Sequence, residues 1–542
     1  MRISSSCVGL ALVLLASSCG GGADVAADDR ALAALIPTHA VVYVRIASLD
    51  ALTAPVQEVA GAAGQDAQQM AGKKVLAQLG GMAGDTQWID STRPFAIAVS
   101  SPKATPPTPM FFVPTTDPAK YAASLTANGL SPVIDGSYVV VPIGGKYEKP
   151  TAPSTFGDGL PAGLVSMRVD AEKVATNFGV VIGTALSAFK ASIAGEMEKN
   201  GSGLDGEAIA DLYVEAARTL LASTSRMEMR VDYRDGRAQL SGSLMAKAGS
   251  AMDGWSSAPV DLTPFAGRLS AKSSFELVLA ADWAKLWPRM ETMMSAMMEA
   301  YPAEVREPMR AMMAGYMKVY EGAGQVIVGD GDILGEGGMR LAMHMAPTDG
   351  KAFVAAIEAI LARPELEQIG AKITSVVSNE VAGAMVREYL MKFDLSKMLG
   401  AQPAAAQEQL ATMMHKVFPA EGMPMRIAVK GQHGVMTLGQ PREDLASSFA
   451  AAKGSWSPVM QAAIAQVGDC NPMMIERIDM AATMDSMMQL MADAGGGSMP
   501  KVPAGASADF VFTAGIRGSE WRFGLGMDAL GFAKMVKAMK TR

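Results

Sequence analysis

The chain has 542 residues, of which 49% are hydrophobic, and its formal net charge is −7. Because a single hydrophobic core rarely serves more than about 250 to 300 residues, this length predicts two domains or a repeated unit. The mild, dispersed negative charge argues against a nucleic-acid-binding protein, which needs clusters of Lys and Arg.

The first 18 residues have the features of a bacterial export signal. Arg2 gives a positive start, residues 7–15 form an apolar core, and small residues follow. The run Ala16-Ser17-Ser18-Cys19 resembles the bacterial lipobox, although Ala16 stands where that motif most often has Leu. The resemblance implies cleavage before Cys19, a diacylglyceryl thioether on its sulfur and acylation of the new N-terminus. Cleavage by an ordinary signal peptidase, without lipid, is the alternative.

The mature N-terminus is therefore expected to be a membrane anchor followed by a tether. Each buried methylene contributes about 0.8 kcal/mol, so two or more acyl chains hold a protein firmly on a bilayer. Residues 19–35 are predicted to be the lipidated Cys19 and a flexible tether, because their Gly, Ala and Asp content buries little apolar surface. By analogy with bacteria that retain lipoproteins in the inner membrane through Asp after the Cys, Gly20 favours the outer membrane.

A second membrane segment is not expected from the rest of the chain. The longest later apolar stretch, Phe178–Phe189, is far shorter than the roughly 20 residues of a spanning helix and is closed by Lys190. We interpret it as a buried helix segment. Cys7 leaves with the signal and Cys19 carries lipid, so Cys470 has no intramolecular disulfide partner and is expected to be a buried small hydrophobe.

The mature chain is built from strands that run into helices. In each case a β-rich run ends at a residue suited to cap a helix N-terminus. Such units are predicted where runs of this kind meet Ser48, Asp117, Asp170, Asp282, Asp349 and Asp479.

Hairpins lie between these units, because alternating apolar residues flank turn-forming dipeptides. The predicted turns are Asp135-Gly136, Asp235-Gly236, His433-Gly434 and Gly518-Ser519. The sequence Gly329–Gly335 faintly resembles a dinucleotide loop or a calcium loop. It lacks the following helix of the first and the oxygen ligands of the second, so a polar turn is predicted.

The order of strands, helices and hairpins repeats along the chain. We therefore predict an α+β fold of two related halves, each a mainly antiparallel sheet with helices packed on one face. The N-terminal half is residues 36–250, the linker 251–272, and the C-terminal half 273–542, with a largely helical insertion near 372–419.

Residues Pro37–Val44 place a Pro shortly before a Tyr-containing strand. This segment and the modular rhythm around it weakly resemble uncharacterised exported bacterial lipoproteins built from strand-helix-hairpin modules. The resemblance implies a fold and a compartment, the cell envelope, and no chemistry.

The chain contains 42 methionines, many of them three or four residues apart on predicted helices. One interpretation is that flexible thioethers fill an Ala-rich core; the other is an adaptable apolar groove for lipid, acyl chains or apolar peptides. The residues of the candidate apolar groove are Met290, Met293, Met294, Met297, Met309, Met312, Met313 and Met317.

Catalytic and metal-binding patterns are scarce. G-x-S-x-G, H-E-x-x-H and C-x-x-C motifs do not occur, and the S-x-x-K at Ser187–Lys190 has no partner motifs. Copper(I) held by Met343-His344-Met345 is improbable because a strand would point His344 away from the two thioethers. A hydrolase-like enzyme would need distant groups such as His344 and His433 to meet, so we expect no enzyme, no metal and no cofactor.

These observations predict a membrane-anchored envelope lipoprotein that acts as a non-catalytic binding or scaffolding module for an unknown ligand. The alternative is a carrier or sensor of apolar ligands that uses the Met-rich helices. The expected partners are the membrane, through the N-terminal lipid, and an envelope protein or apolar ligand. The expected location is the periplasmic side of the outer membrane.

Overall fold

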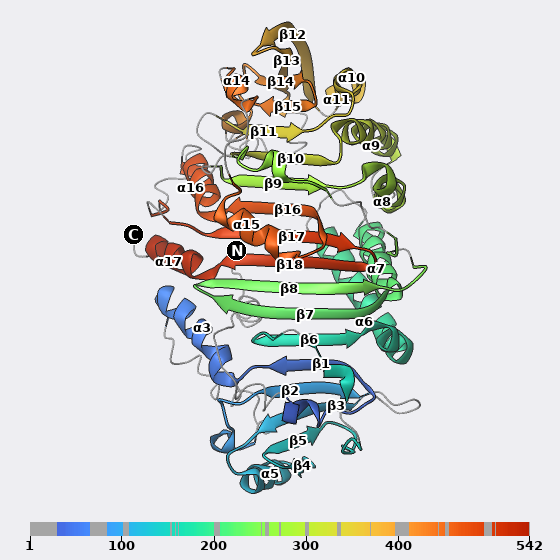
Figure 1. Ribbon diagram of the computed structural model, residues 1–542, viewed down its shortest axis with the longest axis vertical. Helices are drawn as coiled ribbons and strands as arrows, with labels where there is room; N and C mark the ends of the chain where they lie inside the picture. The colour runs from blue at the N-terminus through green and yellow to red at the C-terminus, as the bar shows by residue number, and fades with distance from the viewer. Residues whose placement is uncertain are drawn as a thin grey trace. The chain divides into compact units, whose positions relative to one another are not determined.

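A computed structural model describes most of the chain (Figure 1). The described residues are 30–65, 84–100, 108–151, 154–157, 159–160, 162–199, 206–250, 252–254, 260–269, 273–298, 303–332, 338–368, 370–395, 411–412, 414–442, 444–449, 455–492, 501–503 and 506–540. The predicted signal peptide, Cys19 and the first part of the tether lie outside them.

The chain divides into two compact units. Unit 1 comprises Met1–Ala185, Arg218–Asp253 and Ser519–Thr541, and unit 2 comprises Leu186–Ala217, Gly254–Gly518 and Arg542. The segment Ser519–Thr541 thus belongs to unit 1, although it comes from the predicted C-terminal half.

Unit 1 contains an antiparallel sheet with helices, as the predicted α+β class requires. In spatial order its strands are β4 (Val133–Asp135), β5 (Tyr138–Pro142), β3 (Thr108–Pro114), β2 (Phe95–Ser100), β1 (Ala40–Ile46), β6 (Val165–Asp170), β7 (Thr224–Arg234), β8 (Arg237–Ala246) and β18 (Glu520–Asp528). Its helices are α3 (Leu49–Ala62), α5 (Pro118–Ala127) and α17 (Ala529–Lys540), while α6 (Ala171–Lys199) and α7 (Gly206–Ser223) have residues in both units.

Unit 2 is built in the same way. Its strands are β12 (Ala371–Val381), β13 (Ala384–Phe393), β14 (Met423–Lys430), β15 (His433–Leu438), β11 (Arg340–Met345), β10 (Val326–Asp332), β9 (Phe275–Ala280), β16 (Asn471–Asp479) and β17 (Asp509–Arg517). Its helices are α8 (Trp283–Met298), α9 (Ala303–Ala323), α10 (Gly350–Leu361), α11 (Pro364–Gln368), α14 (Asp444–Ser448), α15 (Pro458–Gln466) and α16 (Met480–Met491).

The strands pair in a corresponding order in both units. β1 lies between β2 and β6, and β9 lies between β10 and β16. On one side β3 and the hairpin β4–β5 continue the first sheet, as β11 and the hairpin β14–β15 continue the second. This order agrees with the repeating pattern of elements, but the descent of the two halves from one duplicated unit stays a prediction.

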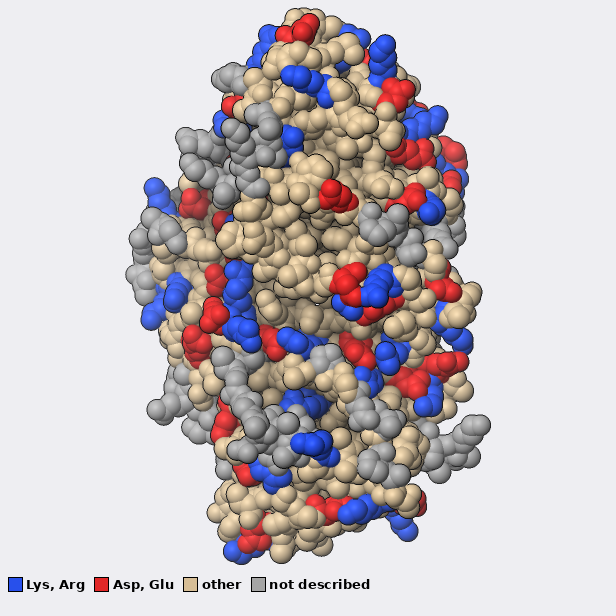
Figure 2. All heavy atoms as spheres, in the orientation of Figure 1, with Lys and Arg blue, Asp and Glu red and all other residues tan. Residues whose placement is uncertain are grey.

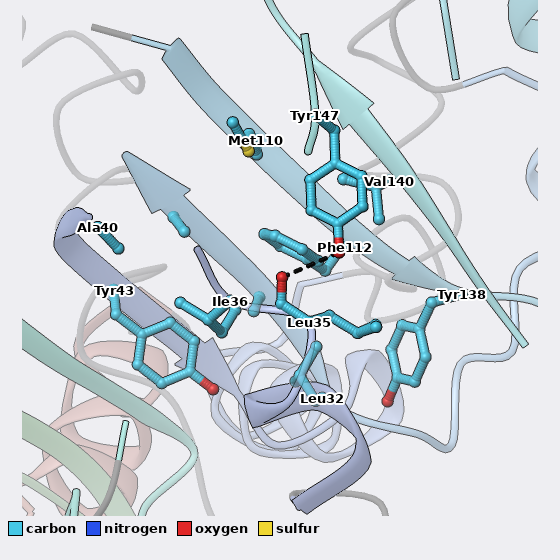
Figure 3. Close-up of a cluster of buried hydrophobic side chains, with 12 residues drawn as sticks. Leu32, Leu35, Ile36, Ala40, Tyr43, Met110, Phe112, Tyr138, Val140 and Tyr147 are labelled. Atoms are coloured by element: carbon cyan, nitrogen blue, oxygen red, sulfur yellow. Dashed lines mark hydrogen bonds between the residues drawn. The ribbon is translucent and has the colours of Figure 1, made fainter. Parts of the chain in front are cut away.

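The core of unit 1 includes residues that were predicted to lie in the tether. Leu32, Leu35 and Ile36, of which the first two were predicted to belong to the tether, are buried against side chains of β1, β2, β3 and β5 (Figure 3). The Tyr147 hydroxyl donates a hydrogen bond of 3.1 Å to the Leu35 carbonyl. The prediction of a tether up to residue 35 is therefore wrong for these residues, because three apolar side chains within five positions are enough to cover one sheet face.

Unit 2 buries apolar side chains on both faces of its sheet. On one face Ile327 of β10 lies in a cluster with Phe353 of α10, and on the other Val326 lies in a cluster with Met460 of α15. One covered face per sheet is thus too simple a description of unit 2. Leu262 and Phe265, inside the predicted linker 251–272, also lie in this second cluster, so those residues are part of the core.

Most of the predicted helix caps are confirmed at atomic detail. The side chains of Ser48, Asp117, Asp349 and Asp479 accept hydrogen bonds from backbone amides in the first turns of α3, α5, α10 and α16. Each cap satisfies amides that have no partner inside the helix.

The predicted helical insertion near 372–419 is wrong for residues 371–393, which form the hairpin β12–β13. Ala382 and Gly383 connect the strands with φ values of 53° and 76°, the left-handed pair of a two-residue hairpin turn. Ala is rarely found in this conformation, so the turn carried no recognisable sequence signal. The described residues 414–417 are helical.

Helix α6 also differs from its prediction. The stretch Phe178–Phe189 was expected to be buried, yet Val180 is 86% exposed and Phe189 is 48% exposed. No single described helix is long and apolar enough to cross a bilayer; the two parts of α6, Ala171–Val180 and Ile182–Ile193, pass that test only together and meet at 75°.

Candidate functional site

A cleft of about 720 Å³ in unit 2 is the candidate site. It lies where β9 and β11 end and β10 and β15 begin, and the start of α8 and the end of α9 border it. We call it the unit 2 cleft. Its apolar wall includes Val260, Phe265, Trp283, Val326 and Met345.

Local backbone geometry explains how this wall is held. Trp283 follows Asp282, whose carboxylate accepts a hydrogen bond from the Lys285 amide in the first turn of α8. The Trp283 indole N–H donates to the Gly324 carbonyl at 2.9 Å. Gly324 has φ +85°, and a Cβ there would lie 2.2 Å from the Ala346 carbonyl oxygen. Glycine is therefore required for α9 to turn into β10 against the end of β11.

The polar groups of the cleft are of both signs. Arg268 and Lys430 line it together with Asp261, Asp282 and Glu321. The Arg268 guanidinium donates to the carbonyls of Pro264 at 3.2 Å and Ser448 at 3.0 Å, and the Lys430 ammonium donates to the Ala382 carbonyl.

Two histidines that were far apart in the sequence meet beside the cleft. His344 Nδ1 lies 3.3 Å from His433 Nε2, and Phe449 packs edge-on against the His433 ring. His344 is 4% exposed, whereas His433 lines the cleft. The strand alternation that argued against copper places His344 with His433, on the face opposite Met343 and Met345.

The environment of the pair keeps both rings neutral at pH 7. Burial, and then the neighbouring His433 and Arg268, lower the pKa of His344 to about 3. Burial and Arg268 lower the pKa of His433 to about 4. Two neutral imidazoles can share one N–H between them, so His433 can present either a donor or an acceptor to a molecule in the cleft.

A second buried polar cluster surrounds Arg477 of β16. The guanidinium donates to Asp509 at 2.8 Å and to the Ser273 carbonyl at 3.2 Å, while Ser273 donates to Asp330 at 2.6 Å. Asp330 and Asp332 are in strand β10, so the polar turn predicted at Gly329–Gly335 is wrong for residues 329–332. Gly331 is needed there because a Cβ would lie 2.0 Å from the Arg340 carbonyl oxygen.

The methionine groove is only partly described. The side chains of Met290, Met293, Met294, Met297 and Met309 lie outside the described residues. Met317 is buried, Met312 and Met313 are half-buried, and none of these three lines the unit 2 cleft. The groove thus stays a prediction. The cleft was missed because the residues that line it come from five separate segments.

The other singled-out residues have simpler surroundings. Cys470 is a buried cysteine, as expected. Within the part of the chain that the structure describes, no three His, Cys, Asp or Glu side chains gather in a metal-binding arrangement.

Comparisons with known proteins name no family for this chain. No family model and no curated protein sequence matches it. It is similar to two crystal structures of TP0453, in crystal forms III and I, with 6% and 9% identity and TM-scores of 0.23 and 0.22. Each alignment covers 52% of this chain and 99% of the other. At such TM-scores the likeness supports no conclusion about function.

Proposed function

We propose that this chain is a lipid-anchored, non-catalytic binding protein of the bacterial cell envelope, and that its ligand enters the unit 2 cleft. The cleft carries this proposal. Ligand sites are typically concave, of about 300 to 1,000 Å³, mostly apolar and equipped with a few polar groups that orient the ligand. The aromatic and aliphatic wall with His433 and Arg268 at one side fits a ligand that has an apolar body and a hydrogen-bonding group.

The anchor rests on the N-terminal sequence. Eleven peptide steps separate Cys19 from Arg30, so at most about 40 Å of extended chain joins the acylated cysteine to the first described residue. The buried residues that follow fasten this tether to unit 1. Gly20, directly after the proposed lipidated cysteine, supports the periplasmic face of the outer membrane as the proposed location.

One feature supports a binding role over catalysis. The His344–His433 pair is neutral and 96% of the His344 surface is covered, so His344 has no route to a molecule in the cleft. Charged side chains of both signs are mixed on the face shown in Figure 2, which is not the single-sign surface of a nucleic-acid-binding protein.

Filling the cleft tests the binding role. Ala284 and Ala346 are exposed residues of its lining, so Ala284→Trp or Ala346→Trp should exclude the ligand while the fold is kept. Native mass spectrometry of the chain purified from its membrane is expected to show a bound small molecule that both variants lose. Ala314→Trp, on an exposed site of α9, is the control and should keep it; equal occupancy in all variants would refute the cleft as the site.

The anchor has its own test. Mass spectrometry of the mature N-terminus should find a triacylated Cys19. A chain that starts at another residue, without lipid, would refute the anchor and leave the cleft untouched.

A further inference from the structure

We propose that the charge-free stretch of α6, residues 174–189, embeds in the bilayer leaflet that holds the acyl chains of Cys19. This inference rests on the proposed lipid anchor, but the two can fail separately. The stretch has 16 residues without a charged side chain, between Lys173 and Lys190.

The apolar surface that α6 exposes is expected to be buried by another molecule. A helix that is apolar on all sides is normally buried in a protein core or in a membrane. Val180 and Phe189 lie in the two parts of α6 that meet at 75°, and both are exposed. Contacts within the chain therefore leave apolar surface uncovered in each part of α6.

The two threonines of the stretch are compatible with lipid. The Thr184 hydroxyl donates to the Val180 carbonyl at 3.0 Å, and the Thr176 hydroxyl donates to the Glu172 carbonyl at 2.8 Å. These threonines satisfy their hydroxyl donors on the helix itself. In hydrocarbon, where no water compensates a lost hydrogen bond, this is the arrangement that costs least.

The position of the anchor identifies the occupant as a bilayer. The tether joins unit 1, to which Ala171–Ala185 of α6 also belongs, and its extended length is at most about 40 Å. Anchored through Cys19, this unit is thus held near a bilayer surface at all times. An apolar helix at that place meets lipid at a far higher local concentration than any free partner.

The bend in α6 limits how deeply the helix can insert into the bilayer. At 1.5 Å per residue the stretch is about 24 Å long, less than the roughly 30 Å hydrocarbon thickness. Because its two parts meet at 75°, it cannot cross as a straight rod. We infer that it enters one leaflet and returns, as a second attachment beside the acyl chains.

Vesicle flotation of the unlipidated protein isolates this contact from the anchor. The full mature chain with Cys19→Ala is mixed with vesicles of phosphatidylethanolamine and phosphatidylglycerol. It is expected to float with them, and Val180→Asp and Phe189→Asp should each reduce the bound fraction at least tenfold. Because both sites are exposed, their thermal unfolding midpoints should stay within a few degrees of the parent.

The control places the same charge on an exposed apolar residue elsewhere in unit 1. Ile134 of β4 is 50% exposed, and Ile134→Asp should float as the parent does. The proposal is overturned if the parent stays in solution, or if Ile134→Asp loses as much binding as Val180→Asp. It is also overturned if light scattering shows a dimer that Val180→Asp dissociates without any vesicle binding, since a second copy would then cover α6.

A fluorescent probe gives an independent readout. With Cys19 replaced and Cys470 buried, Val180→Cys offers one accessible thiol for an environment-sensitive dye. Vesicles should shift its emission to the blue, and quenchers carried on lipid chains should quench it. An unchanged spectrum would contradict insertion even if the protein floated.

Discussion

Two arginines, Arg168 in unit 1 and Arg477 in unit 2, occupy corresponding places and differ in one neighbour. Each lies two residues before the aspartate that caps the next helix, donates to a carboxylate on the following strand and donates to a backbone carbonyl. For Arg168 these acceptors are Glu228 at 2.9 Å and Phe156 at 2.8 Å; for Arg477 they are Asp509 at 2.8 Å and Ser273 at 3.2 Å.

The difference lies on the central strand. Tyr43 of β1 is opposite Arg168, whereas Glu276 of β9 is opposite Arg477. Glu276 is 1% exposed, its Oε2 has no hydrogen-bond partner among the described residues, and Arg477 Nη1 lies 3.6 Å from that oxygen. Burial raises the pKa of Glu276, Arg477 opposes this, and Asp330 and Asp509 raise it further.

In unit 1 the Arg168 guanidinium balances one carboxylate. In unit 2 the Arg477 guanidinium is shared among several carboxylates. A buried charge network is stable only if every member is paired. Unit 2 therefore contains a buried carboxyl group with a raised pKa where unit 1 has a phenol ring. Four predictions test this contrast.

The largest effect is expected from removing the arginines. Arg477→Leu removes the guanidinium that faces the buried carboxyl groups of Glu276 and Asp509 and should destabilise unit 2 by about 3–5 kcal/mol. Arg168→Leu should cost about 1–3 kcal/mol, because Arg226 still lies 3.3 Å from Glu228. Urea unfolding of both variants measures the difference; an equal loss would mean that the two clusters are equivalent.

Acid should act mainly on unit 2 through the histidine pair. The folded-state pKa values of His344 and His433, about 3 and 4, lie below the ordinary value of about 6.5 in the unfolded chain. Between these limits the unfolded state binds more protons, so stability falls as pH is lowered from about 6.5 toward 4. At pH 5 the cost is about 2 kcal/mol for His344 and less for half-buried His433.

Thermal unfolding between pH 7 and pH 5 checks this dependence. His344→Met should flatten the slope, and His415→Gln, at an exposed site, should leave it unchanged. A parental slope in His344→Met would show that other groups cause the acid sensitivity.

Glu276 should make the stability of unit 2 depend on pH in the opposite direction. Its pKa is raised in the folded state, so its favourable contribution is complete at pH below the unfolded value and is lost as pH rises through the folded value. Glu276→Gln should therefore stabilise unit 2 by about 1–2 kcal/mol at alkaline pH. In unit 1, Glu228→Gln at the counterpart of Asp509 should destabilise, since it weakens the ion pair with Arg168. Stability curves against pH would contradict the contrast if both substitutions moved in the same direction.

The smallest effects are expected at the neighbouring caps. Asp170 accepts a hydrogen bond from the Lys173 amide, and Asp479 accepts from the amides of Ala481 and Ala482. Asp→Ala at either position should cost about 1 kcal/mol, with the larger loss at Asp479 because two amides lose their acceptor. Chemical denaturation resolves the two values, and a larger loss at Asp170 would refute this order.

The amino-acid sequence by itself determined the features that depend on neighbours within a few residues. Ser48, Asp117, Asp349 and Asp479 cap the predicted helices because a side-chain oxygen reaches amides two or three positions ahead. Asp235-Gly236 forms the predicted hairpin turn because its φ values of 53° and 79° suit these two residues. The α+β class followed from the order of such local elements.

Only the tertiary structure decided which surfaces are covered and which distant groups meet. His344 and His433 are 89 positions apart, and the register of β11 against β15 brings them together. The apolar pattern of α6 was visible in the sequence, but its exposure was not, because burial depends on whether another element lies over a helix. The apolar area of a side chain determines how much free energy its burial contributes. Whether the protein buries that side chain depends on the tertiary fold.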